Sequence, residues 1–275
     1  MTSATITATK FATRGAERPS TFMDALISEW TKLTSLRATY ITLGLGVILS
    51  IGTTAIAAVG MGASGAEWPE QFDPILFSMV GNVFALITYS VFGVLVVSRE
   101  YSSGTIRLTL TGTPNRGRVL AAKLLLVSSI TLVYGLATTI GMFQVGQALL
   151  GAYGYPTSSL AHADARWVVL GLGVTMPFFP ILGLAFGFLL RSTAGAITTV
   201  LGLLWLPQIF SEVMPVWGRE HLISKLPGAG LDSTTIGQMM EAPEYSSFIA
   251  GFVIATVWFV AILGAAYFAF TRRDA

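Results

Sequence analysis

Long apolar runs alternate with short charged segments along the chain. Six runs are free of Asp, Glu, Lys and Arg, apart from one lysine near the start of the third run. Each has the roughly 20 residues that a helix needs to cross the hydrocarbon layer. They lie at about 40–60, 75–97, 119–145, 167–190, 192–211 and 247–270. Backbone polar groups in lipid must be satisfied within the chain, and the alternating polarity of a barrel is absent. The pattern therefore predicts an all-α integral membrane protein with six transmembrane helices.

Composition agrees with this pattern. Hydrophobic residues make up 53% of the chain and charged residues only 11%, whereas a soluble domain must cover its core with charge. The first apolar run begins near Tyr40, far later than in a cleaved secretory signal, so we expect no such signal. Residues 1–19 are polar and are expected to form a disordered cytoplasmic arm. With no cysteine, disulfides and thiol chemistry are excluded.

The distribution of basic residues predicts the orientation. If both termini lie on one side, thirteen of the sixteen basic residues lie on that side, and only Arg166, Arg219 and Lys225 lie on the other. Cytoplasmic segments carry an excess of Lys and Arg. We therefore expect both termini and the segment 98–118 in the cytoplasm, and the long segment 212–246 outside.

The segment 20–38 predicts an amphipathic helix before the first span. Its apolar face comprises Phe22, Met23, Leu26, Ile27, Trp30 and Leu33, and its polar positions include Asp24, Ser28, Glu29 and Lys32. Acidic residues come early and Lys32 and Arg37 late, as the helix dipole favours. Such a stripe suits a helix lying in the membrane interface or one packed on the inside loops; we expect the interface.

The inside segment 98–118 contains residues that the orientation in the membrane alone does not require. It contains Arg99 and Glu100, then Gly104, then the short amphipathic run TIRLTL of residues 105–110. Pro114 disfavours helix at Thr113 and should end this run. Glu100 is an acid in a basic loop, so it either pairs locally with Arg99 or Arg107 or contacts a partner protein. The segment predicts a short inside helix that docks on a soluble partner.

The stretch SREYSSGTIRLTLTGTPNRGRVLAAK resembles a pattern of the permease subunits of type-2 ABC (ATP-binding-cassette) exporters. The matching positions are Glu100, Gly104-Thr105-Ile106, Pro114, Arg116 and Lys123. The opening ISEWTKLTSLRATYITL also resembles theirs, through Glu29, Lys32-Leu33 and Arg37. With the six spans, the resemblance covers about residues 22–273.

This resemblance implies a fold, partners and site residues. It makes 39–275 a six-span permease domain in a bacterial cytoplasmic membrane and the segment 20–38 an interface helix, with Phe22, Leu26, Trp30, Lys32 and Arg37 as its site residues. Residues 99–110 become a coupling helix seated in a groove of the ATPase; the site residues are Arg99, Glu100, Gly104, Thr105, Ile106, Arg107 and Leu108. The expected partners are separate ABC ATPase subunits and a second permease, either a copy or a relative; nucleic acid is not expected.

The chain lacks the features of an enzyme or an ATP-binding subunit. None of its four lysines follows a glycine, so no Walker loop is present, and ATP and Mg are expected on the partner ATPase rather than on this chain. His162 and His221 lack neighbours at metal-ligand spacing, so no metal site is expected.

The uncharged polar residues of the spans are candidates for a cargo pathway. They are Asn82, Tyr89, Gln144 and Gln208, with Gln147 beside them. Asn82 and Tyr89 share a helix face and either line a cavity or hydrogen-bond neighbouring helices. The absence of charge in the spans favours an apolar or amphipathic cargo. Rival functions are a secondary transporter or channel, and a non-transporting immunity or scaffold protein of the membrane.

Two local patterns predict irregular structure. The sequence MPFFP at 176–180 should kink the fourth span, because two prolines remove backbone donors. Gly183 and Gly187 form a pair of small residues that favours close helix packing. The segment 212–246 is too long to be a bare loop, and its resemblance to the family implies short helices that turn back toward the membrane.

Overall fold

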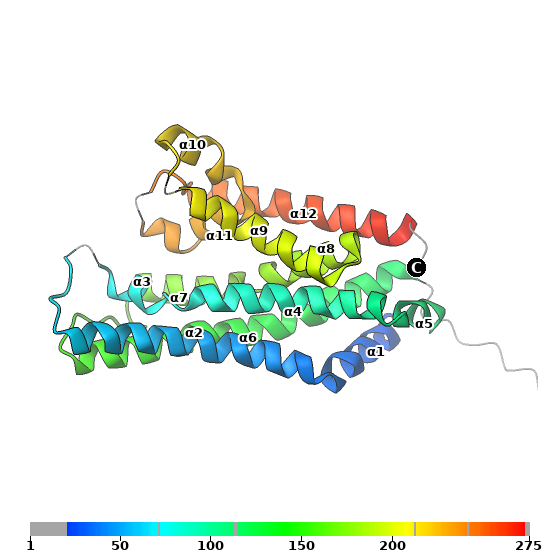
Figure 1. Cartoon of the computed structure of the whole chain (residues 1–275), viewed down its shortest axis with the longest axis horizontal. Coiled ribbons are helices and arrows are strands. Elements are labelled where there is room, and N and C mark those ends of the chain that lie inside the picture. Colours follow the sequence, from blue (N-terminus) through cyan, green and yellow to red (C-terminus); the bar gives the residue numbers. More distant parts are fainter. Residues whose placement is uncertain (1–20, 71, 113–114, 212, 241, 273–275) are drawn as a thin grey trace, which may run out of the picture.

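The computed structural model describes residues 21–272 except 71, 113–114, 212 and 241, and every regular element within these ranges is a helix (Figure 1). The long helices are α2 (Arg37–Ser64), α4 (Asn82–Ser102), α6 (Arg116–Ala152), α7 (Ala163–Thr175), α8 (Phe178–Leu190), α9 (Thr193–Ser211) and α12 (Phe248–Arg272). The other helices are α1 (Phe22–Ser35), α3 (Pro74–Ser78), α5 (Thr105–Gly112), α10 (Val216–His221) and α11 (Pro227–Ser233), with 3-10 turns η1 (Ile223–Lys225) and η2 (Ile236–Gln238). The predicted arm 1–19 and the predicted break at Pro114 lie outside the described residues.

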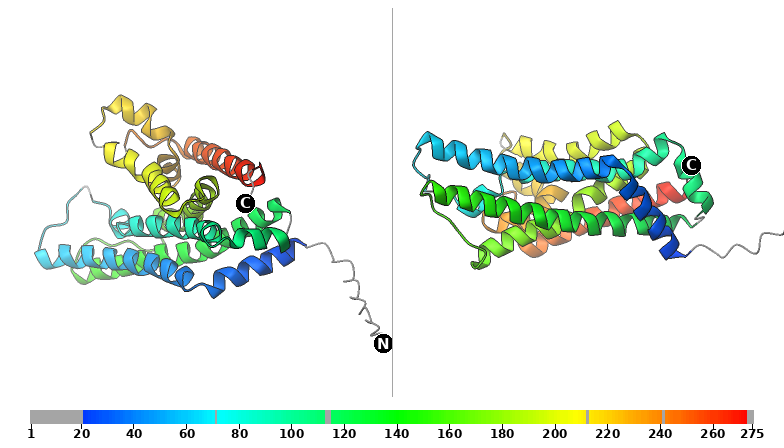
Figure 2. Two further views of the ribbon diagram at one scale, coloured as in Figure 1. Left: turned by 45° about the vertical axis from the view of Figure 1, so that its right-hand side comes forward. Right: turned by 90° about the horizontal axis from the view of Figure 1, so that it is seen from below.

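Six helices are long and apolar enough to span a membrane, which confirms the all-α prediction of six spans. They are α2, α4, α6, the pair α7 and α8 taken together, α9 and α12. The helices α2, α4 and α6 pack side by side, and α1 meets α2 at a corner (Figures 1 and 2). The protein is therefore a multi-pass membrane protein with a short helix attached at an angle to its first span.

The second predicted span, 75–97, is wrong in its outline. The structure divides this run into α3 and α4, with a turn at 79–81, and α4 continues to Ser102. Asp73 caps α3 by accepting from the backbone N–H of Ile75 and Leu76. At Gly81 the chain passes so close to the carbonyl of Ser50 in α2 that no side chain fits. An apolar run shows that a segment is buried but cannot show this close contact, so the sequence missed the break.

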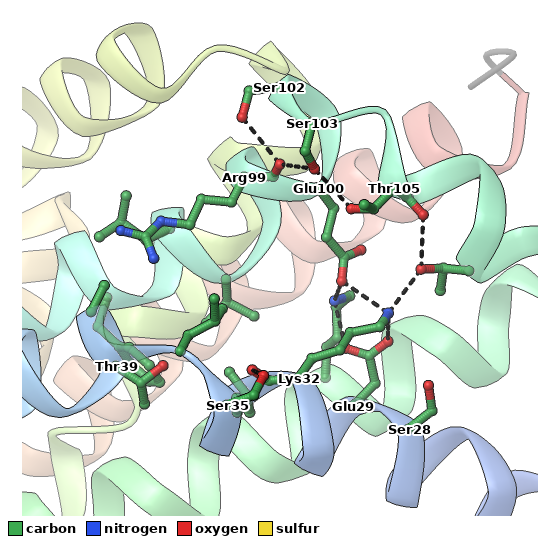
Figure 3. A pocket seen from close by; sticks show the side chains of 18 of the residues that line it. Ser28, Glu29, Lys32, Ser35, Thr39, Arg99, Glu100, Ser102, Ser103 and Thr105 are labelled. Atoms are coloured by element: carbon green, nitrogen blue, oxygen red, sulfur yellow. Dashed lines mark hydrogen bonds and ion pairs between the residues drawn. The ribbon is translucent and has the colours of Figure 1, made fainter.

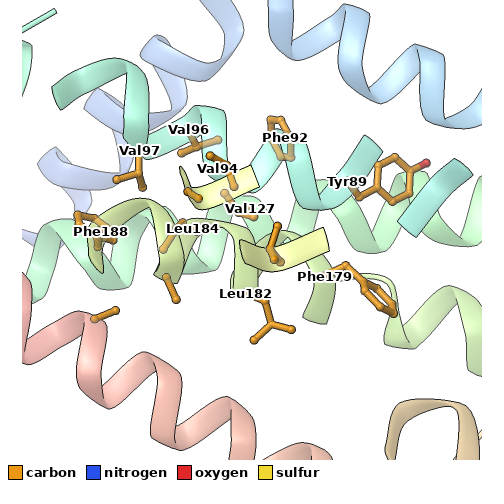
Figure 4. Close-up of a cluster of buried hydrophobic side chains, with 14 of the residues drawn as sticks. Tyr89, Phe92, Val94, Val96, Val97, Val127, Phe179, Leu182, Leu184 and Phe188 are labelled. Carbon is orange, nitrogen blue, oxygen red and sulfur yellow. The ribbon is translucent and has the colours of Figure 1, made fainter. Parts of the chain in front are cut away.

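The tightest packing joins α4 to α8. A Cβ on Gly183 would collide with the carbonyl oxygen of Ser90, and one on Gly93 would collide with the backbone of Pro180. This confirms the packing role predicted for the Gly183 pair. Valines of α4 and side chains such as Leu184 and Phe188 of α8 fill the core beside this contact (Figure 4). The predicted kink is also confirmed, because α7 ends at Thr175 and α8 begins at Phe178.

The segment 212–246 contains α10, η1, α11 and η2, as expected for a segment with structure of its own. Its helix α11 packs on α12 and also contacts α9. Gly230 allows the close approach, because a Cβ there would lie 3.1 Å from the carbonyl oxygen of Gly251. The segment therefore covers one end of the bundle and is not a loose loop.

The two ends of the bundle differ in their elements. The helices α1 and α5 and the last turn of α12 lie at one end, while α3, α10 and α11 lie toward the other (Figure 1). At the first end, the Arg116 guanidinium donates to the carbonyl of Phe270 and lies 5.8 Å from that ring. The start of α6 is thereby joined to the end of α12, next to α5.

Candidate functional site

The helix α1 has one face buried against the bundle and one exposed apolar face. Its first turn is fixed by a capping box, in which Thr21 and Asp24 each accept from the other's backbone N–H. One face, Ala25, Glu29 and Leu33, is buried against the bundle. The opposite face leaves four large apolar side chains between 40% and 58% exposed: Phe22, Met23, Ile27 and Trp30. Such an exposed stripe is typical of a helix that lies on a membrane surface.

The sequence-based division of these faces was wrong in two places. Glu29 was assigned to the polar positions, yet it is 2% exposed, and Leu33 was grouped with Phe22 and Trp30 on one apolar face, yet it is 3% exposed and lies on the buried face. The reason is that Glu29 has partners deep in the bundle, which the periodicity of a single helix cannot reveal. Lys32 is half-buried beside it, and Arg37 opens α2 as an exposed residue.

Four charged residues meet where α1, α4 and α6 pack together, and we call them the charge cluster: Glu29, Lys32, Glu100 and Lys123 (Figure 3). The Lys123 ammonium lies 2.6 Å from Oε2 of Glu29 and 2.7 Å from Oε1 of Glu100. The Lys32 ammonium lies 2.7 Å from Oε1 of Glu29 and 3.0 Å from Oε1 of Glu100. Each lysine thus bridges both carboxylates, and the cluster joins α1, α4 and α6.

Burial makes this cluster strongly interdependent. Lys123 is 1% exposed and Glu100 is 8% exposed, so each charge depends on its partners for the solvation that water would give. Burial lowers the pKa of Lys32, but hydrogen bonding and charge from Glu29 and Glu100 outweigh it, so the pKa is raised overall. Lys32 therefore stays protonated and keeps its ion pairs with both carboxylates.

Glu100 has partners that the sequence did not suggest. The expected local partners were Arg99 and Arg107, whereas the structure pairs Glu100 with Lys32 and Lys123. Its second oxygen, Oε2, is buried and has no hydrogen bond to any residue that the structure describes. Through these two ion pairs, Glu100 in α4 connects α1 with α6.

The helix α5 is positioned by a tight turn and by the cluster. Gly104 has a φ of +72°, a left-handed conformation that glycine adopts without strain, and it turns the chain from α4 into α5. Ile106 is buried at 3%, and the hydroxyl of Thr109 accepts from the Lys32 ammonium at 2.8 Å. Thr105, Arg107 and Leu108 are exposed, Leu108 to 75%, and Thr105 and Leu108 also border the cavity described in the next paragraph. The helix is held on one side and presents an apolar side chain on the other.

A cavity of about 670 Å³ opens beside the cluster, between α1, the start of α2, the end of α4 and α5. Arg99 lines it, and its guanidinium points away from the carboxylate of Glu100 (Figure 3). The site therefore combines a neutral buried cluster with a partly open, basic cavity.

The candidate pathway residues do not come together. Tyr89 is fully buried, and its hydroxyl lies 2.7 Å from that of Thr138 in α6. Asn82 is half-buried, and its Oδ1 has no hydrogen bond. Gln144 is exposed, and Gln208 is exposed and donates to Asp232. None of the four lines the cavity of about 670 Å³ or the second large one of about 600 Å³.

Sequence reasoning missed Glu29, Lys123 and Thr109 as members of one site. One signal was present: Lys123 interrupts the third apolar run, and a charge at the edge of a span needs a partner. Glu29 lies four residues from both Ala25 and Leu33, so it also shared their helix face. Joining these signals required the tertiary structure.

Residues 25–204 match the family model described as "ABC-2 family transporter protein". The match covers well over half of the chain and includes all four residues of the charge cluster and the whole of α5. Comparison with the curated proteins gives no match.

Proposed function

Because the chain belongs to the ABC-2 transporter family, we propose that it is the permease subunit of an ABC exporter in a bacterial cytoplasmic membrane. It is a membrane-spanning component of an ABC transporter. The cargo that we propose is apolar or amphipathic, because the described spans hold few charges and those of the cluster neutralise one another. ATP and Mg would bind to separate ATPase subunits, and a second permease, a copy or a relative, would complete the route.

The proposed orientation places α1 and α5 in the cytoplasm. Basic residues at that end include Lys32, Arg99 and Arg272, while the opposite end carries Arg166, Arg219 and Lys225. This asymmetry supports the cytoplasmic assignment, because positively charged segments remain inside.

The observation that carries the proposal is the charge cluster under α5. It ties α1, α4 and α6 together, and Thr109 attaches α5 to the same group. A push on the exposed face of α5 would therefore reach two membrane-spanning helices and the surface helix at once. In this proposal the ATPase contacts α5 around Arg107 and Leu108, and closure of the ATPase on ATP moves these helices together.

The test places a charge on the proposed contact. Leu108→Glu should abolish co-purification of the ABC ATPase that is co-expressed with the chain, because an unpaired carboxylate would replace an apolar contact. Val213→Glu is the matched control, since Val213 is 79% exposed and lies at the opposite end of the bundle. Both variants should reach the membrane at wild-type levels. Retention of the ATPase by Leu108→Glu, or equal loss in the control, would contradict the proposed contact.

A further inference from the structure

The cavity beside the charge cluster has the properties of an anion-binding site with an apolar wall. We propose that it binds a phospholipid with a singly negative headgroup, taken from the leaflet next to α1, with the start of its acyl chains against the apolar wall. The assignment to the inner leaflet rests on the orientation in the proposed function. The binding itself requires neither an ATPase nor a cargo.

Charge is the first argument. Three basic and two acidic side chains line the cavity: Lys32, Arg99 and Lys123, against Glu29 and Glu100. The four members of the cluster neutralise one another through ion pairs between 2.6 and 3.0 Å. The remaining positive charge is that of Arg99. One negative charge in the cavity would balance it.

Arg99 is the second argument. Within the described part of the chain, its guanidinium makes no hydrogen bond or ion pair, while its backbone carbonyl accepts from the hydroxyls of Ser102 and Ser103. The side chain is half-buried and points into the cavity (Figure 3). A guanidinium presents a planar set of donors that matches a phosphate in two parallel hydrogen bonds. An unused guanidinium in a cavity is thus suited to a phosphate ligand.

The other lining residues divide into a polar and an apolar part. The polar part consists of the hydroxyls of Ser35, Thr39, Ser103 and Thr105. Those of Ser35 and Ser103 donate to the carbonyls of Lys32 and Arg99, so they would have to reorient to donate to a phosphate or glycerol oxygen. Leu33, Leu36, Phe92, Leu95 and Val96 form an apolar wall. A small inorganic anion would leave this wall wet, whereas an amphipathic anion uses both parts.

The position of α1 indicates the source of such a molecule. Its outward stripe, Met23, Ile27 and Trp30, lies 50% to 58% exposed, as expected for a helix with its apolar side in the headgroup region. The cavity is lined by the opposite side of the same helix, at Glu29, Lys32 and Leu33. Membrane phospholipids are therefore the amphipathic anions nearest to it.

Native mass spectrometry of the purified, delipidated full chain tests the proposal. The protein is titrated separately with phosphatidylglycerol and with phosphatidylethanolamine of the same acyl chains. For the first bound lipid, the wild type should have an apparent Kd roughly tenfold lower for phosphatidylglycerol, the effect of one charge-assisted contact. Arg99→Gln should abolish this preference, and Arg99→Lys should keep part of it. Because the Arg99 guanidinium has no partner to lose among the described residues, both variants should fold.

Arg272→Gln is the control, because Arg272 is exposed at the same end of the bundle and lies outside the cavity. It removes the same charge and should keep the wild-type preference. Three results would each overturn the proposal: Arg99→Gln that still prefers phosphatidylglycerol, Arg272→Gln that loses the preference to the same degree, or displacement of the lipid by an equal concentration of free glycerol phosphate. Because no ATPase is present, these results are independent of the proposed transport function.

Discussion

Lys123→Met is the most direct test of the charge cluster. The Lys123 ammonium is 1% exposed and lies within 2.7 Å of a carboxylate oxygen of both Glu29 and Glu100. Methionine has a similar volume but no charge, so two buried carboxylates would share the single ammonium of Lys32. Removing one partner of a buried ion pair costs about 3–5 kcal/mol. Because Lys32 still reaches both carboxylates and its side chain is 32% exposed, we expect the lower end of this range.

A loss of about 3 kcal/mol corresponds to a fall in Tm on the order of 10 °C for a chain of this size. The assay is thermal unfolding of the detergent-purified protein, followed by loss of monomer in size-exclusion chromatography. The double variant Lys123→Met with Glu100→Gln restores charge balance and should regain most of the lost Tm. Lys225→Met is the control, because Lys225 is exposed at the other end and should leave Tm unchanged.

Two results would refute the reasoning about the cluster. The first is an unchanged Tm for Lys123→Met, which would show that the buried ion pairs contribute nothing net. The second is a double variant that is less stable than the single one, which would show that packing or hydrogen bonding, and not charge balance, explains the effect.

Three further predictions concern other parts of the molecule. A reporter inserted at Asn115 should report the cytoplasm and one near Pro243 the outside; an outside signal at Asn115 would overturn the proposed orientation. Burial raises the pKa of Asp232 from 3.8 to about 7, and the hydrogen bond from Gln208 offsets only part of this shift. Between these two pH values the folded state keeps a proton that the unfolded state releases, so Tm should fall as pH rises from about 4 to about 7. Asp232→Asn should remove this pH dependence of Tm. Asn82→Leu should leave Tm unchanged, because the Oδ1 of Asn82 accepts no hydrogen bond from the described residues. An altered cargo preference at normal protein levels would then assign Asn82 to the pathway, and a large fall in Tm would contradict this prediction.

The sequence was sufficient to predict the spans, because the free energy of placing charge in lipid is large and local in the sequence. It was also sufficient for the break between α7 and α8, where Pro177 acts on its own backbone. It failed at 79–81, since the break there depends on contact between Gly81 and the carbonyl of Ser50 in another helix. Features set by neighbouring residues could be predicted from the sequence, and contacts between helices could not.

The same limit applies to the candidate site. The short helix over residues 105–110 followed from residues next to one another, but the turn at Gly104, which leaves Arg99 and Glu100 in α4 and divides the expected coupling helix 99–110, was not predicted. The cluster did not, because Glu29, Glu100 and Lys123 are separated by tens of residues and meet only after three helices pack. A contact with a partner protein was therefore one of two interpretations of Glu100, and neither named Lys32 and Lys123, with which it pairs within the chain.

The length of α6 has a mechanical consequence. It is a single helix of 37 residues without a proline, so it measures about 55 Å, whereas the hydrocarbon layer is about 30 Å thick. Near its middle, Gly135 lies against α7, where a Cβ would come within 2.9 Å of the Gly173 carbonyl oxygen. One end carries Lys123, and toward the other Gln147 donates to the carbonyl of Pro74 at 2.8 Å. This one helix therefore connects the charge cluster at one end of the bundle with α3 at the other, so a displacement of α6 as a rigid body would move both ends together.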